Sequence, residues 1–101
     1  MTTLWALLAG FFIANGIPHF VKGISGETFP TMIKKQSSAT LNVLWGSFNF
    51  AIGLSFLNLA TPGGAVPLGV DRWVLLGGAF VMALVNASFF SKGVRLPWWK
   101  D

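Results

Sequence analysis

The feature that most constrains the fold is the grouping of apolar residues into three long runs. The runs cover about residues 4–21, 39–60 and 73–90, and each is long enough to cross about 30 Å of hydrocarbon at ~1.5 Å per helical residue. Only 10% of the residues are charged, against roughly 25% in an ordinary soluble domain. The sequence therefore predicts one all-α membrane domain over residues 1–101, with three transmembrane helices.

The first apolar run has two interpretations, a retained transmembrane helix or a cleaved signal peptide. The residues before it include no basic residue, and it ends in the sequence PHFVK at residues 18–22 rather than in the small residues of a cleavage site. Both observations favour a retained helix. In the polar segment that follows, apolar side chains are expected to lie on the membrane surface, and Ser37 or Ser38 is expected to cap the second helix.

Basic residues are concentrated on one side of the predicted bundle. The loop after the first helix and the C-terminal tail hold six of the seven, and Arg72 alone lies on the other side. The positive-inside rule then places this loop and the C-terminus in the cytoplasm and the N-terminus outside. Because these residues flank apolar runs, lipid headgroups are the expected partner rather than nucleic acid. A multi-pass protein of a cell membrane, of the bacterial inner-membrane kind, is predicted.

Small residues recur every four positions in each predicted helix, a spacing typical of close helix packing in membranes. Three helices of this length bury little surface alone, so a homo-oligomer or a place in a larger membrane complex is expected. The predicted packing residues are Ala6, Gly10, Ala14, Ser47, Ala51, Ser55, Ala79, Ala83 and Ala87. Tryptophans near the ends of the runs are predicted to anchor the helices at the membrane interface. They are Trp5, Trp45, Trp73, Trp98 and Trp99.

Four polar side chains are predicted to share the cytoplasmic half of the membrane: Asn15, His19, Asn49 and Asn86. They are expected to face the bundle interior, because polar groups are costly in lipid. One interpretation is that they are interhelical hydrogen-bond partners. The other is a polar pocket in which His19 is the one group that titrates near neutral pH. Pro18, beside it, is expected either to end the helix or to break it along a cavity.

The composition also limits the possible chemistry. The chain has no cysteine, which excludes disulfides and thiol catalysis. Its acids, Glu27, Asp71 and Asp101, lie in predicted loops or at the terminus, so neither a metal site nor another cofactor is expected within one chain. An enzyme acting on a lipid would need a base and a nucleophile, and only His19 and scattered serines are available. The protein is predicted not to be an enzyme.

The sequence ANGIPHFVKG at residues 14–23, followed by NVLWG at 42–46 and NFAIG at 49–53, resembles the DoxX-like small bacterial integral membrane proteins. Gly16, His19 and Phe20 match a Gly-x-x-His-Phe element that ends the first helix in that group. The resemblance covers about half of the chain, which has three predicted helices where the group usually has four. It implies a membrane protein of poorly defined role, sometimes tied to redox or stress pathways, and supplies no catalytic residue.

Two functions follow from these patterns. The first is an oligomeric or accessory subunit of a membrane complex, which requires flat faces of small residues. The alternative is a minimal oligomeric transporter or channel with a polar site in the cytoplasmic half of the membrane, which requires the polar residues to converge on a cavity.

Overall fold

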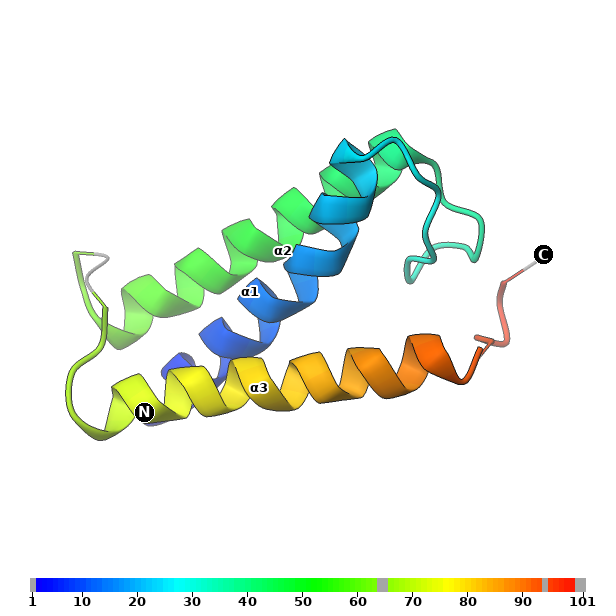
Figure 1. Ribbon diagram of the computed structural model, residues 1–101. Helices are drawn as coiled ribbons and strands as arrows, with labels where there is room; N and C mark the ends of the chain where they lie inside the picture. Colours follow the sequence, from blue (N-terminus) through cyan, green and yellow to red (C-terminus); the bar gives the residue numbers. More distant parts are fainter. Residues whose placement is uncertain (1, 64–65, 94, 100–101) are drawn as a thin grey trace.

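A computed structural model describes the chain as three α-helices joined by two loops (Figure 1). The residues described are 2–63, 66–93 and 95–99. The helices are α1 (Thr2–Ile24), α2 (Ala39–Ala60) and α3 (Val70–Ser91). Each is long and apolar enough to cross a membrane, and no strand occurs within the described ranges. The prediction of an all-α fold with three helices of membrane-spanning length is confirmed.

The helix bounds differ most from prediction in α1, which continues through Pro18 to Ile24. The helix therefore neither ends at the proline nor breaks there. Proline removes one main-chain hydrogen bond, but contacts with α2 on both sides of it hold the helical path. At the start of α2, the Ser38 hydroxyl accepts a hydrogen bond from the Leu41 amide at 3.0 Å. Of the two serines predicted as possible caps, Ser38 is therefore the one that caps α2.

The helix α1 lies between the other two. It packs against both α2 and α3, whereas α2 and α3 do not pack against each other along their described lengths. Figure 1 shows α1 close to α3 at one end and diverging from it toward the other. The first loop and the C-terminal tail lie at this open end, so they, rather than a fourth helix, occupy the space between α1 and α3.

The interface between α1 and α2 is built on glycines. A Cβ atom on Gly46 would lie 2.7 Å from the main-chain nitrogen of Phe20, and one on Gly16 would lie 2.8 Å from the Gly46 carbonyl oxygen. Two turns further along α2, a Cβ on Gly53 would lie 2.6 Å from the Ile13 side chain. No larger residue fits at these positions without moving backbone, which explains the close approach of the two helices.

The predicted packing residues divide into two sets. Those of α1 are buried, and Gly10 meets the backbone of α3 near Ala79. Those of α2 are exposed, since its glycine face packs on α1 instead. The exposed members of the predicted set are Ser47, Ala51, Ser55, Ala83 and Ala87. Their predicted role therefore does not apply to contacts within one chain, because glycine allows a closer approach than alanine or serine does.

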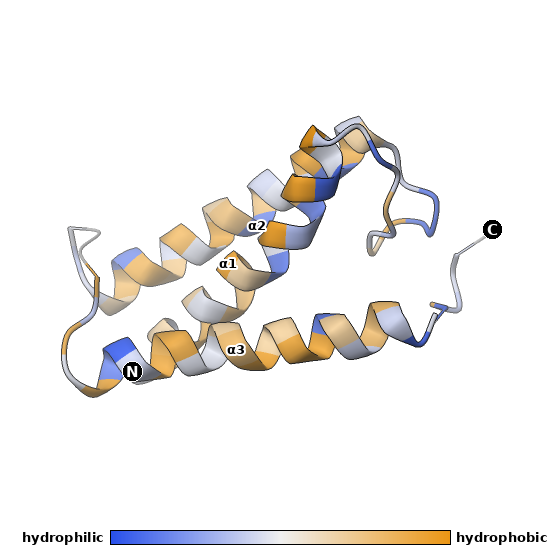
Figure 2. Cartoon of the chain, viewed as in Figure 1, coloured by the Kyte–Doolittle hydropathy of each residue, from blue (hydrophilic) through white to orange (hydrophobic). Residues whose placement is uncertain are grey.

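The outer faces of the helices are apolar over most of their length (Figure 2). Large side chains such as Leu44, Leu54 and Phe80 are more than half exposed, and Gly78 is the one buried residue among the described positions of α3. Exposing so much apolar surface to water would be costly at about 25 cal/mol per Å². These faces suit a hydrocarbon environment.

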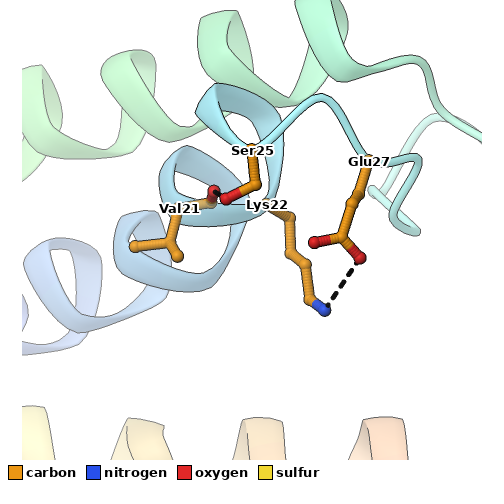
Figure 3. Close-up of polar contacts among 4 residues, drawn as sticks. All are labelled: Val21, Lys22, Ser25 and Glu27. Atoms are coloured by element: carbon orange, nitrogen blue, oxygen red, sulfur yellow. Dashed lines mark hydrogen bonds and ion pairs between the residues drawn. The ribbon is translucent and has the colours of Figure 1, made fainter.

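The C-terminal end of α1 is closed by local contacts (Figure 3). The Ser25 hydroxyl donates to the Val21 carbonyl oxygen at 2.8 Å, and the chain turns at Gly26 with φ of 76°, a value that favours glycine. Lys22 and Glu27 then form an exposed ion pair at 3.4 Å. Such a pair adds little stability, so the turn is set chiefly by Ser25 and Gly26.

Candidate functional site

The first loop and the C-terminal tail form one folded unit at the open end of the bundle. Inside the loop, the hydroxyls of Thr31 and Ser37 lie 2.7 Å apart, and both residues are buried. From the tail, the indole N–H of Trp99 donates to the Thr31 carbonyl oxygen at 3.0 Å, and that of Trp98 donates to the Met32 carbonyl oxygen at 2.6 Å. The loop is therefore held to the tail and is more than a segment lying on the membrane surface.

Asn42 organises the contact between α1, α2 and this loop. Its side chain is fully buried, and its Nδ2 donates to the carbonyl oxygens of Phe29, Ser37 and Ser38 at 2.8 to 3.2 Å. Its Oδ1 lies 2.9 Å from the Nδ1 of His19. Because Oδ1 can only accept, Nδ1 carries the hydrogen in a neutral imidazole, and the lone pair is left on Nε2.

A second polar contact joins α1 and α2 two turns away. The Asn15 Nδ2 donates to the Asn49 Oδ1 at 3.0 Å, and the Asn49 Nδ2 donates to the Trp45 carbonyl oxygen at 2.8 Å. Asn49 is thus an interhelical hydrogen-bond partner with both ends of its amide paired. Asn15 uses only its Nδ2, and its Oδ1 makes no hydrogen bond to another described residue.

Three of the four predicted polar residues line one cavity of about 130 Å³. They are Asn15 and His19 from α1 and Asn86 from α3. Asn49 is not among the lining residues. The Asn86 side chain is partly buried and makes no hydrogen bond within the described part of the chain. The polar residues of α1 and α3 therefore converge, although they are far apart in sequence.

The rest of the cavity wall is aromatic and aliphatic. Phe89 and Phe90 of α3 and Trp99 of the tail line it, and the loop contributes Thr31. Phe89 meets Trp99 edge-on, with 6.0 Å between ring centroids. Phe90 packs at 4.5 Å between ring centroids on Phe29, which in turn meets the His19 ring edge-on at 5.4 Å. These contacts hold the imidazole in place together with the Asn42 hydrogen bond.

Trp45 of α2 completes the wall, and its indole Nε1 is buried with no hydrogen-bond partner among the described residues. A buried donor without a partner costs about 1–3 kcal/mol of stability. Such a group in a folded protein calls for an explanation, and a functional role of the site is one. The position of Trp45 near the end of an apolar run predicts a place at the membrane interface. Its relation to Asn42 and Asn49, at positions i−3 and i+4 on one helix face, is the signal that would have placed it inside.

The other predicted anchors lie as follows. Trp73 is 65% exposed beside Arg72, with 5.5 Å between the guanidinium carbon and the ring centroid. Trp5 is partly buried and stacks on Phe56 at 5.6 Å. Trp98 is exposed, but Trp99 is only 6% exposed. The Trp99 ring is covered by the protein and hydrogen-bonded to the loop, and its place at the membrane interface stays a prediction.

The chemistry of the cavity is that of neutral groups. None of the described residues lining it is a lysine, arginine or carboxylate, and no cluster of three metal-binding side chains occurs among the described residues. Amides, one imidazole and aromatic rings can position a molecule by hydrogen bonds and contact.

Comparisons with family models, with curated proteins and with solved structures find no match to the chain. The resemblance to DoxX-like proteins stays a prediction carried by the residues quoted for it.

Proposed function

We propose that this protein binds a small, mostly apolar molecule inside the membrane, in the cavity between α1, α3 and the first loop. The observation that carries the proposal is the convergence of Asn15, His19 and Asn86 on one cavity. Asn49 uses both ends of its amide in hydrogen bonds within the protein, whereas Asn86 lines the cavity and makes no hydrogen bond within the described part of the chain. Of the two functions predicted, a minimal transporter with a polar site is favoured by this arrangement.

We place this cavity in the cytoplasmic half of a cell membrane. What supports this orientation is charge: the first loop holds Lys34 and Lys35, and the tail holds Arg95. The loop and tail meet through Trp98 and Trp99, so their charges lie at one end of the bundle. The positive-inside rule assigns that end to the cytoplasm.

Binding or passage suits the cavity better than chemical conversion. The Nδ1 of His19 is engaged by Asn42, and no serine or carboxylate stands beside it in the described cavity wall to act as nucleophile or second acid. The remaining polar groups of the wall are the Thr31 hydroxyl, which is hydrogen-bonded to Ser37, the indole N–H groups of Trp45 and Trp99, and two amides. None of them exchanges protons with a bound molecule near neutral pH.

Assembly with further copies, or with a larger membrane complex, is the second part of the proposal. It is supported by the separation of α2 from α3 and by the small residues exposed on α2, Ser47, Ala51 and Ser55. Small residues on a lipid-facing surface permit another helix to approach closely. Native mass spectrometry of the protein taken gently from its own membrane measures the number and identity of the subunits; a monomer alone would contradict this part.

The binding proposal is tested by filling the cavity. Val85 lines it, whereas Leu76 on the same helix does not, and the two side chains are about equally exposed, at 51% and 53%. Wild type, Val85→Trp and Leu76→Trp are extracted in polymer nanodiscs, and their small molecules are compared by liquid chromatography and mass spectrometry. We expect a species that wild type and Leu76→Trp retain and Val85→Trp loses. Equal contents in all three would overturn the proposal.

A further inference from the structure

We infer that the molecule bound in this cavity is uncharged, has an apolar body about the size of one aromatic ring, and presents a hydroxyl or N–H hydrogen-bond donor to the wall. The inference rests on the proposed binding function and names the class of molecule that the cavity selects. It follows from three properties of the wall: its unpaired polar atoms, its lack of charge and its size.

The unpaired atoms at the wall are mainly acceptors. Asn15 donates through Nδ2 to Asn49, which leaves its Oδ1 lone pairs. His19 is bound through Nδ1, and because Asn42 fixes the hydrogen there, its Nε2 is an acceptor as well. Neither atom has a hydrogen-bond partner among the described residues. Both acceptors come from α1, four residues apart on one face of the helix.

Donors are fewer. Asn86 supplies one amide group, which both donates and accepts. The indole N–H of Trp45 is also unpaired, but its nitrogen is covered by neighbouring atoms, so a molecule in the cavity reaches it only if those atoms move. A molecule with a hydroxyl or amide N–H pairs with the acceptors of α1, while one that only accepts leaves them without a partner.

Charge and size narrow the class further. An ion would enter a low-dielectric site with no opposite charge among its described lining residues, a placement that costs far more than hydrogen bonds return. The cavity volume of about 130 Å³ is close to the roughly 150 Å³ of an apolar cavity that holds benzene. Phe89, Phe90 and Trp99 supply flat apolar surface for such a ring.

A matched pair of probes separates the contribution of the hydrogen-bond donor to binding from that of the aromatic ring. We choose para-fluorophenol and para-fluoroanisole, which differ in that methylation removes the hydroxyl hydrogen and keeps the oxygen. Fluorine NMR measures binding of each to the protein in nanodiscs, with empty nanodiscs giving the background from partition into lipid. We expect wild type to prefer the phenol by about threefold to tenfold, the contribution of one hydrogen bond.

Two variants locate the effect. Asn15→Leu keeps side-chain size and removes the Oδ1 acceptor at the cavity wall, so we expect the preference to fall by about half or more. Asn58→Leu makes the same change at an exposed position near the far end of α2, and the preference should be unchanged. Circular dichroism reports whether each variant is folded; if Asn15→Leu is not, the wild-type comparison alone decides.

The inference is overturned if wild type binds neither probe, binds both equally or prefers the anisole. It is also overturned if a folded Asn15→Leu keeps the full preference. These outcomes leave the proposed binding function standing when Val85→Trp still loses a species that wild type retains. The binding function itself fails only if that retained species is absent.

Discussion

The Nδ1 of His19 and the Oδ1 of Asn42 lie 2.9 Å apart and join the C-terminal part of α1 to the first turn of α2. The same Asn42 side chain donates to three main-chain carbonyls of the loop and helix start. One residue thus holds two helices and a loop, and it sets the tautomer of the histidine that lines the cavity. The predictions below begin with this pair.

Replacing Asn42 with leucine should destabilise the protein by about 3 kcal/mol, because one imidazole N–H and several buried carbonyls lose their partner at once. The measurement is thermal unfolding in detergent, followed by circular dichroism. Asn58→Leu is the control, since Asn58 is exposed and its side chain accepts only the Gly63 amide at 3.2 Å. Equal midpoints for the two variants would contradict the central role of Asn42.

Gly46→Ala should destabilise the helix pair by about 1–3 kcal/mol, because its Cβ would lie 2.7 Å from the Phe20 main-chain nitrogen and the backbones must separate. Gly77→Ala is the matched control on α3, where a Cβ meets nothing within 4 Å. There the better helix propensity of alanine should leave stability unchanged or raised by up to ~1 kcal/mol. Thermal unfolding of both variants measures the difference, and a stable Gly46→Ala would show that the helices are less closely packed.

Trp99→Phe keeps the ring and removes the indole hydrogen bond to the Thr31 carbonyl oxygen. We expect amide hydrogen exchange in the first loop to become about threefold to tenfold faster, the effect of losing one hydrogen bond. Hydrogen–deuterium exchange with mass spectrometry measures this for peptides covering residues 29–37. Trp73→Phe, at a position 65% exposed, should leave the same peptides unchanged. Unchanged loop exchange in Trp99→Phe would mean that the tail does not hold the loop.

The absence of cysteine allows the orientation to be tested with single added thiols. Gln36→Cys lies in the first loop and Pro62→Cys at the opposite end, and both positions are exposed. An impermeant maleimide added to right-side-out vesicles should label Pro62→Cys at once and Gln36→Cys only after the vesicles are opened. The reverse labelling pattern would place the loop and tail outside the cell.

Helices and their caps could be predicted because they depend on local composition. Three apolar runs give three helices, and a serine beside the second run caps it. The faces of the helices could not be predicted in the same way. In a membrane the lipid side and the protein side are both apolar, so hydrophobicity does not distinguish Gly46, which packs on α1, from Ser47, which is exposed.

The residues of the site could be predicted only in part, because hydrophobicity identifies polar residues that avoid lipid but does not show which apolar residues lie beside them. Asn15, His19 and Asn86 are polar enough to be assigned to the interior wherever they occur, and they do meet at one cavity. Trp45 and Trp99 also line it, but tryptophan is common both at membrane interfaces and in protein interiors. Only the long-range contact between the tail and the loop places Trp99, and no local pattern reports a contact between residues 68 positions apart.

Because α3 packs on α1 and not on α2, the chain separates into a helical hairpin and a third helix that is added later. The contacts between α1 and α2, including the Asn15–Asn49 and His19–Asn42 hydrogen bonds, involve no residue after Ala60. As the protein is synthesised and inserted, this hairpin can be complete while α3 is still in the ribosome. The cavity has no wall on the side of α3 until α3 and the tail are added, so the proposed binding site is the last part of the molecule to form.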